Sequence, residues 1–216
     1  MMRTIMRCGA AVMLALGTFS VAACTAEDEQ LTPTLALKAA AVLGDVDAAR
    51  AALDAGADPQ AAPAGASALH VAARADAAEM VRLLLEAGAD PDARQTRGDT
   101  ATHLAIYGGG TEALAALLDA GADPDILDGE AYESSPVHMA AVFGNLGALD
   151  LLEAAGADLD VTNADGWRPI DQAVCAGQFD SVDWFLARGE YELSRGRACA
   201  ADLGRDDMVA YIDGLG

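Results

Sequence analysis

A short phrase, Gly-Ala-Asp, returns along this chain at nearly constant intervals and constrains its fold more than any other feature. Its copies begin at Gly56, Gly88, Gly121 and Gly156, and Gly189-Glu190 is a decayed fifth copy. The interval is about 33 residues, a period typical of repeat proteins whose units cannot bury an apolar face alone. The sequence therefore predicts a single elongated stack of similar units.

Each period contains two short helical patterns. In the second helix of the unit that ends at Gly121, Leu114, Leu117 and Leu118 have the i, i+3, i+4 spacing of one helix face. Glycine after the last turn suits the left-handed conformation that ends many helices, and Asp123-Pro124 then turns the chain outward. The predicted fold class is therefore all-α, with helix pairs joined by extended, turn-rich fingers.

A second motif marks the start of the first helix in each unit. Its clearest copy is Ser135-Pro136-Val137-His138-Met139-Ala140-Ala141, with weaker copies over residues 67–73, 100–105 and 168–173. Ser or Thr caps a helix and Pro fits its first turn. With this motif and period the chain resembles the ankyrin-repeat family over roughly 180 residues. The resemblance implies an ankyrin-repeat solenoid of stacked helix-turn-helix units that binds other proteins.

The motifs also divide the chain into segments. The acidic stretch Glu27-Asp28-Glu29 has no hydrophobic pattern and predicts an extended tether, and Thr32-Pro33 is predicted to open the first helix. The predicted segments are 1–23 (signal peptide), 24–33 (lipidated acidic tether) and 34–216 (ankyrin-repeat domain), the last comprising an N-cap 34–57, repeats 58–89, 90–122, 123–157 and 158–190, and a C-cap 191–216.

The first residues have the pattern of an export signal. Arg3 and Arg7 precede an apolar run, residues 10–19, that is too short to span a bilayer. Val21-Ala22-Ala23-Cys24 resembles a bacterial lipobox, which predicts cleavage before Cys24 and lipidation of that residue. By the sorting rule of such lipoproteins, Thr25 implies the outer membrane, facing the periplasm. The alternative is ordinary cleavage after Ala23, which would release a periplasmic or secreted protein.

The charge of the chain narrows the class of partner. The formal net charge is −21, which disfavours nucleic acid and anionic lipid, so membrane contact is expected only through the Cys24 lipid. An acidic surface favours a basic protein partner through faster encounter. The alternative is that the charge only keeps the protein soluble. A monomer is expected.

Three groups of residues are candidate reaction centres. His70, His103 and His138 share one repeat position on helices that pack 8–10 Å apart, too far apart for one zinc ion. The glycines of 108–110 lack the lysine of a phosphate-binding loop, and the acids of 123–133 miss the spacing of a calcium loop. The sequence therefore predicts no catalytic residue, no metal and no cofactor, and structural histidines.

Two cysteines besides Cys24 follow the signal segment, Cys175 and Cys199. An oxidising compartment permits a disulfide between them. The resemblance, however, places Cys175 at an exposed, variable position and Cys199 at a core position. A buried free thiol at Cys199 is the favoured expectation, with the disulfide as the alternative.

Superposition on the ankyrin pattern gives the candidate binding residues. They face the concave side, at finger tips and at the exposed ends of first helices, and aromatic residues and arginine are favoured at interface centres. They are Arg74, Arg97, Asp99, Tyr107, Tyr132, Glu133, Val142, Phe143, Asp165 and Trp167. Tyr132 and Trp167 could equally fill gaps between fingers. The finger between Asp123 and His138 is the longest, as binding-face insertions often are.

The functional hypothesis is an exported, lipid-anchored and non-catalytic module that grips a protein through its concave face. An immunity or stress-protection role is suggested by family resemblance alone. The alternative is a structural envelope tether, in which anchor and stack length matter more than any groove. An unrecognised enzyme is the least favoured hypothesis.

Overall fold

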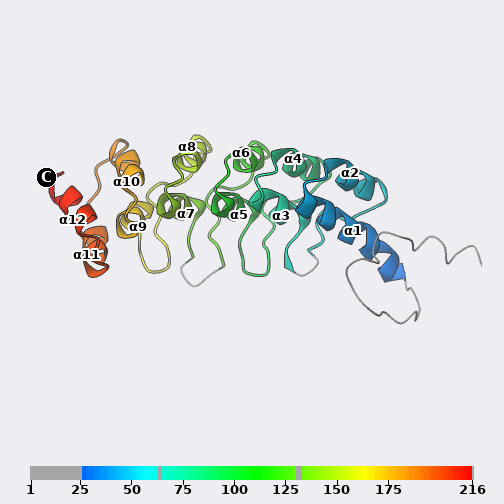
Figure 1. The fold of residues 1–216 in the computed structure, drawn as a ribbon, viewed down its shortest axis with the longest axis horizontal. Helices are drawn as coiled ribbons and strands as arrows, with labels where there is room; N and C mark the ends of the chain where they lie inside the picture. The colour runs from blue at the N-terminus through cyan, green and yellow to red at the C-terminus, as the bar shows by residue number, and fades with distance from the viewer. Residues whose placement is uncertain (1–25, 63–64, 130–132, 216) are drawn as a thin grey trace, which may run out of the picture.

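The computed structural model describes residues 26–62, 65–129 and 133–215, with side chains from residue 33 onward. The helices of these ranges form two rows, and extended fingers connect one unit to the next on the side of the first row (Figure 1). The first row consists of α1 (Ala26–Leu43), α3 (Ala68–Arg74), α5 (Ala101–Gly108), α7 (Pro136–Phe143), α9 (Pro169–Ala176) and α11 (Ser194–Asp202). The second row consists of α2 (Val46–Asp54), α4 (Ala78–Glu86), α6 (Glu112–Asp119), α8 (Leu146–Ala154), α10 (Phe179–Leu186) and α12 (Asp206–Asp213). The predicted all-α solenoid is confirmed.

Helices α3, α5 and α7 start at the predicted hydroxyl residues. In α5 the backbone N–H of Thr100 donates to Nδ1 of His103 at 3.3 Å, and the Thr100 hydroxyl lies 2.9 Å from the same nitrogen. Ser67 in α3 and Ser135 in α7 make the same capping box with the histidine three residues later. These contacts satisfy backbone donors that the first helical turn leaves without an intrahelical partner.

The second helices end at the glycines of the repeated phrase. Gly56, Gly88, Gly121 and Gly156 have φ between 86° and 93°, the left-handed conformation that the phrase predicts. Gly189 does not share it, so the expectation of a fifth copy is wrong in this respect. Its N–H donates to the carbonyl of Phe185 at 3.2 Å, which continues the helical hydrogen-bonding pattern past α10.

Acids two residues beyond the phrase join neighbouring units. The N–H of Asp123 donates to the Asp92 carboxylate at 2.9 Å, and the N–H of Asp158 donates to the Asp125 carboxylate at 2.9 Å. In the earliest finger, Gln60 takes the acceptor position. Hydrogen bonds to a charged acceptor are stronger than neutral ones. Part of the acidic charge therefore belongs to the scaffold.

A continuous apolar core runs between the two rows. Leucines of the second helices, among them Leu84, Leu117 and Leu152, are fully buried against small residues such as Ala105 and Ala140 of the first row. Alanine at these positions lets helix backbones approach closely, and burying one leucine contributes about 2 kcal/mol. Because each unit contributes only a thin layer of this core, units are stable only when stacked.

The first helix starts earlier than expected. It begins at Ala26, so the stretch 26–31 is helical and not an extended tether, and Pro33 lies inside the helix. Ala, Glu, Gln and Leu are good helix formers, and acidic side chains in the first turn interact favourably with the positive end of the helix dipole. Pro33 lies within the first two turns of the helix, so its missing N–H removes one hydrogen bond close to the helix start.

The predicted signal peptide, Cys24 and Thr25 lie outside the described residues, as does Tyr132. Of the helices that the structure describes, none combines the length and the apolar character required to cross a bilayer.

Candidate functional site

The buried histidines fix the positions of the fingers. Nδ1 of His138 accepts the N–H of Ser135, so Nε2 carries the proton, and it lies 2.8 Å from the carbonyl oxygen of Trp167 in the next finger. His103 makes the same link at 3.3 Å to the carbonyl of Ser134. Burial lowers the pKa of both imidazoles, which favours the neutral form that the two hydrogen bonds require. The structural role expected for these residues matches their contacts.

The fingers and the exposed sides of the first helices line the same surface, which we call the inner face. Tyr107 on α5 and Phe143 on α7 are 56% and 49% exposed and form an edge-to-face pair with ring centroids 5.9 Å apart. The Arg74 guanidinium on α3 lies 5.1 Å from the Tyr107 ring centroid. Three consecutive units thus bring predicted residues into one contact row. An aromatic pair or a cation–π pair contributes about 1 kcal/mol beyond the burial of its surface. A partner that covers these rings would gain binding energy by burying the area that is still exposed.

The inner face continues toward the C-terminus as a groove of about 540 Å³. One wall is the finger that carries Asp165 and Trp167, and the opposite end is formed by residues that follow α11. Its lining residues are Ser134, Val142, Asn163, Asp165, Trp167, Gln172, Cys175, Ala176, Leu203 and Arg205. The groove brings together three predicted binding residues, Val142, Asp165 and Trp167, from two units.

Trp167 both fills a gap and lines the groove. The Arg195 guanidinium of α11 lies 4.5 Å from the centroid of its ring, and Nη2 of Arg195 donates to the carbonyl of Asp165 at 2.8 Å. The indole is half-buried, and it also lines a second hollow of about 320 Å³ beside α11. Trp167 therefore packs against its neighbours and also lines the groove, so each of its two expected roles describes part of its surroundings.

The other predicted residues lie apart from this row and groove. Arg97 and Glu133 are exposed on the third and fourth fingers, and Glu133 has a φ of 48°. Asp99 is half-buried and accepts a hydrogen bond from the Gln95 side chain within its own finger. Asp99 therefore contributes to the finger itself. No contact joins these three residues to the Tyr107–Phe143 pair among the interactions of the described residues.

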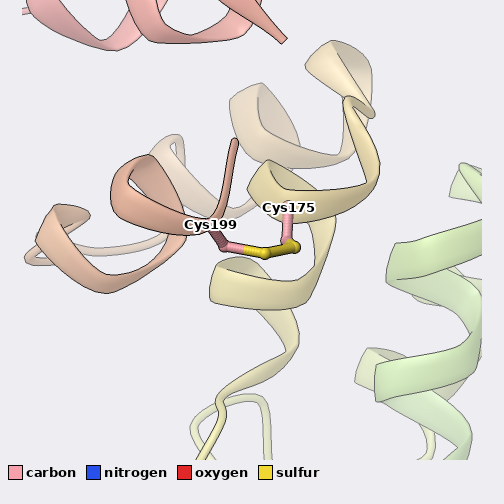
Figure 2. The surroundings of a disulfide bond; sticks show 2 residues. All are labelled: Cys175 and Cys199. Carbon is pink, nitrogen blue, oxygen red and sulfur yellow. A yellow bond between two sulfur atoms is a disulfide. The ribbon is translucent and has the colours of Figure 1, made fainter. Parts of the chain in front are cut away.

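The favoured expectation for the cysteines is wrong. Cys175 on α9 and Cys199 on α11 form a disulfide, with Cα atoms 5.3 Å apart (Figure 2). Cys199 is half-buried rather than a core residue, because the core position of α11 belongs to its neighbour Ala200. The N–H of Arg205 donates to the carbonyl of Ala200 as that of Gln178 donates to Ala173, so Cys199 takes the repeat position of Gln172, which is also half-buried. At this position Cys199 lies within bonding reach of Cys175 on α9.

Sequence reasoning missed the contribution of the last helix pair to the groove. Leu203, 61% exposed, precedes Gly204 as Phe143 precedes Gly144, and both glycines have positive φ. That shared position before a left-handed glycine was a signal in the sequence. Arg205 carried no such signal, since only packing against Gly177 directs its guanidinium into the groove.

The described residues contain no cluster of three or more His, Cys, Asp or Glu side chains that could hold a metal ion. The three histidines each use Nδ1 for their own helix cap. The inner face presents aromatic rings, aliphatic groups and a few charged side chains, which are typical of protein interfaces.

Comparison with known proteins agrees with this architecture. The family model described as ankyrin repeats (3 copies) matches residues 11–95, 36–128 and 103–195, most of the chain. No curated protein matches significantly. Ankyrin repeats generally bind protein partners, and they are usually non-catalytic binding scaffolds. The chain belongs to the ankyrin-repeat family.

Proposed function

We propose that this protein is an exported, lipid-anchored module that binds a protein partner through its inner face. The observation that carries the proposal is the pair formed by Tyr107 and Phe143, two aromatic side chains about half exposed on a rigid stack. Large exposed aromatic residues add nothing to the core of a soluble domain, yet they are enriched at the centres of protein interfaces. Arg74, which lies against Tyr107, and Trp167, which lines the groove with Val142, are also of residue types enriched at interface centres.

The scaffold supports rigid-body recognition. The fingers are held to the helices by His103 and His138 and to one another by Asp92 and Asp125. A surface fixed in this way loses little conformational entropy when it binds, which favours affinity. The net charge of −21 would speed the approach of a basic partner and make association weaker at high salt.

Export and anchoring complete the proposal. They rest on the Arg3/Arg7 start, the apolar run of 10–19 and the lipobox-like Val21–Cys24. A module held at the periplasmic side of an outer membrane could neutralise or protect an envelope protein, as an immunity or stress-protection factor does. A structural tether is the second candidate, and the early start of α1 favours it: the helix begins two residues after Cys24, so a lipid there would hold the stack close to the membrane.

Site-specific photo-crosslinking in cells tests the inner face. A photoreactive phenylalanine analogue replaces Tyr107 or Phe143 in turn, and Arg82, exposed on α4 in the second row, is the control position. We expect both inner-face positions to give the same defined adduct and Arg82 to give none. Equal adducts from both rows, or no adduct from the inner face, would overturn the proposal.

A matched pair of triple variants then tests which residues bind. Replacing Tyr107, Phe143 and Trp167 with alanine should lower recovery of the crosslinked partner at least 10-fold, while replacing Arg50, Arg82 and Glu86 of the second row should leave it unchanged. The Cys24→Ala variant separates the two candidate functions. A tether loses its function without the lipid and tolerates the inner-face changes, whereas a binding module still recognises its partner in solution.

A further inference from the structure

We propose that the Cys175–Cys199 disulfide is a redox-controlled clamp that holds the last helix pair, and with it one wall of the groove, on the stack. The clamp would regulate binding at the inner face, and its biological role rests on the function proposed above. The structural part, selective opening of α11 and α12 on reduction, is testable without a partner.

The last helix pair is weakly held by its core. Helix α11 buries only Gly196 and Ala200, and helix α12 buries only Met208. By contrast, α9 buries five residues, among them Ile170 and Val174. Local stability in a repeat stack follows the burial of each unit against its neighbour. By this measure the terminal pair costs less to open than the unit before it.

The other contacts that attach the pair to the stack are made by individual side chains. Arg195 donates to the carbonyls of Gly166 and Asp165 and covers the Trp167 ring. The Tyr211 hydroxyl donates to Asp183 of α10, and the Tyr211 ring packs edge-to-face on Phe179 at 5.3 Å between centroids. The ion pair of Arg197 and Asp213 joins α11 to α12, so it leaves with the pair and does not anchor it. Most of these side chains are at the surface, where polar contacts stabilise weakly.

The disulfide lies at the point where the last helix pair meets the rest of the stack. It joins the side of α9 to the side of α11 (Figure 2). At Gly196 an added Cβ would meet the Val174 side chain and the Asp171 carbonyl, so the two helices are in close contact beside the bond. The cross-link closes a loop of 24 residues that includes α10. Such a loop restricts the opened state strongly.

The bond is also open to a reductant. Both cysteines are half-buried, Cys175 lines the groove and Cys199 lines the neighbouring hollow. A thiolate of a dithiol attacks one sulfur, forms a mixed disulfide and releases the other protein thiolate. The second thiol of the reductant then displaces the first protein sulfur, which leaves two protein thiols and one oxidised dithiol. Access from the groove makes this exchange feasible without unfolding.

Opening of the pair would remove a defined part of the inner face. Leu203 and Arg205 line the groove from the C-terminal side, and Arg195 covers the Trp167 ring. All three leave with α11 and the residues after it. The row of Tyr107 and Phe143 lies on α5 and α7 and stays in place. Reduction would thus disable one end of the surface and spare the other.

Hydrogen–deuterium exchange of the purified chain tests the clamp, with the oxidised protein, the dithiothreitol-reduced protein and the Cys175→Ser/Cys199→Ser double variant compared. We expect peptides from 193–213 to exchange on the order of 100-fold faster in the second and third samples. Peptides from α3 to α8 should exchange at the same rate in all three. The double variant treated with dithiothreitol is the control and should show no further change.

Two results would overturn the clamp: unchanged exchange of 193–213 on reduction, or equal acceleration along the whole chain. A different result would contradict the proposed function and leave the clamp intact. If the cap opens selectively but crosslinks from Leu203 and Tyr107 to a partner are both absent, the clamp stands and the binding proposal falls. If a partner crosslinks from Leu203 equally in both redox states, the groove binds and the clamp is wrong.

Discussion

Arg168 and Asp171 form an ion pair, with Nε and Oδ2 2.9 Å apart, at the two positions where the preceding unit has Ser135 and His138. The pair reproduces both functions of the imidazole. Asp171 accepts the N–H of Arg168 at the helix start, and Nη2 of Arg168 donates to the carbonyl of Glu192 in the next finger. The apparent decay of the motif in this unit is therefore a replacement by a charged pair.

The first prediction concerns this replacement. Asp171→Ala should lower the free energy of unfolding by roughly 3 kcal/mol, since it leaves a partly buried guanidinium without its carboxylate. The double change Arg168→Ser/Asp171→His, which installs the pair found in α7, should recover most of that loss. Urea unfolding measures both. A double variant as unstable as the single one would show that the two pairs are not equivalent, and Arg197→Ala, at an exposed pair, is the control.

The second prediction concerns pH. Burial lowers the pKa of His70, His103 and His138 in the folded chain, so the unfolded chain takes up protons first as the pH falls below about 6.5. The stability that depends on neutral imidazoles is fully present above that value and is lost as the pH falls toward the folded-state pKa. Each histidine contributes a slope of at most about 1.4 kcal/mol per pH unit. Urea midpoints between pH 7.5 and pH 5 measure the slope.

A glutamine at position 103 provides the test of that slope. His103→Gln keeps a side chain that can cap Thr100, because glutamine is a common residue at this position of a capping box. The variant should therefore fold and lose less stability than the wild type between pH 7 and pH 5.5. An unchanged slope in this variant would assign the pH dependence to other groups.

The third prediction compares two glycines. Gly98 and Gly88 have φ of 91° and 93°, but a Cβ on Gly98 would lie 2.3 Å from the Cα of Gly129 in the next finger, while one on Gly88 meets open space. Both alanine variants carry the left-handed strain of about 1 kcal/mol. Gly98→Ala should cost a further 1–3 kcal/mol, roughly, because two finger backbones must separate. Equal midpoints in thermal unfolding would show that the fingers adjust freely.

The fourth prediction separates binding residues from core residues. Tyr107→Ser and Phe143→Ser should each change the free energy of unfolding by less than about 1 kcal/mol, since both side chains are about half exposed. Leu149→Ala, fully buried on α8, should cost roughly 3 kcal/mol. Differential scanning calorimetry compares the three. A loss at Tyr107 as large as that at Leu149 would mean that the aromatic row serves the fold.

Repeat register accounts for the placement of some candidate residues, and contacts within the fingers account for others. Repeat register places Tyr107, Val142 and Phe143 on one surface, because the first helices of a repeat present equivalent positions to the same face. Asp99 has the repeat position of Trp167, just before a helix cap, but turns into its own finger, toward Gln95, which local hydrogen bonding decides. Register gives the direction of a side chain on a regular helix, and it does not give the contacts made within a loop.

The sequence by itself determined that this chain is a stack of helix pairs, because capping residues, apolar spacing and chain-reversing glycines recur every 33 residues or so and act locally. Tertiary structure alone decided how units meet. The Cys175–Cys199 bond and the groove end at Leu203 and Arg205 depend on how closely α11 packs beside α9. That approach is fixed by packing between units, and the period of a sequence carries no record of it.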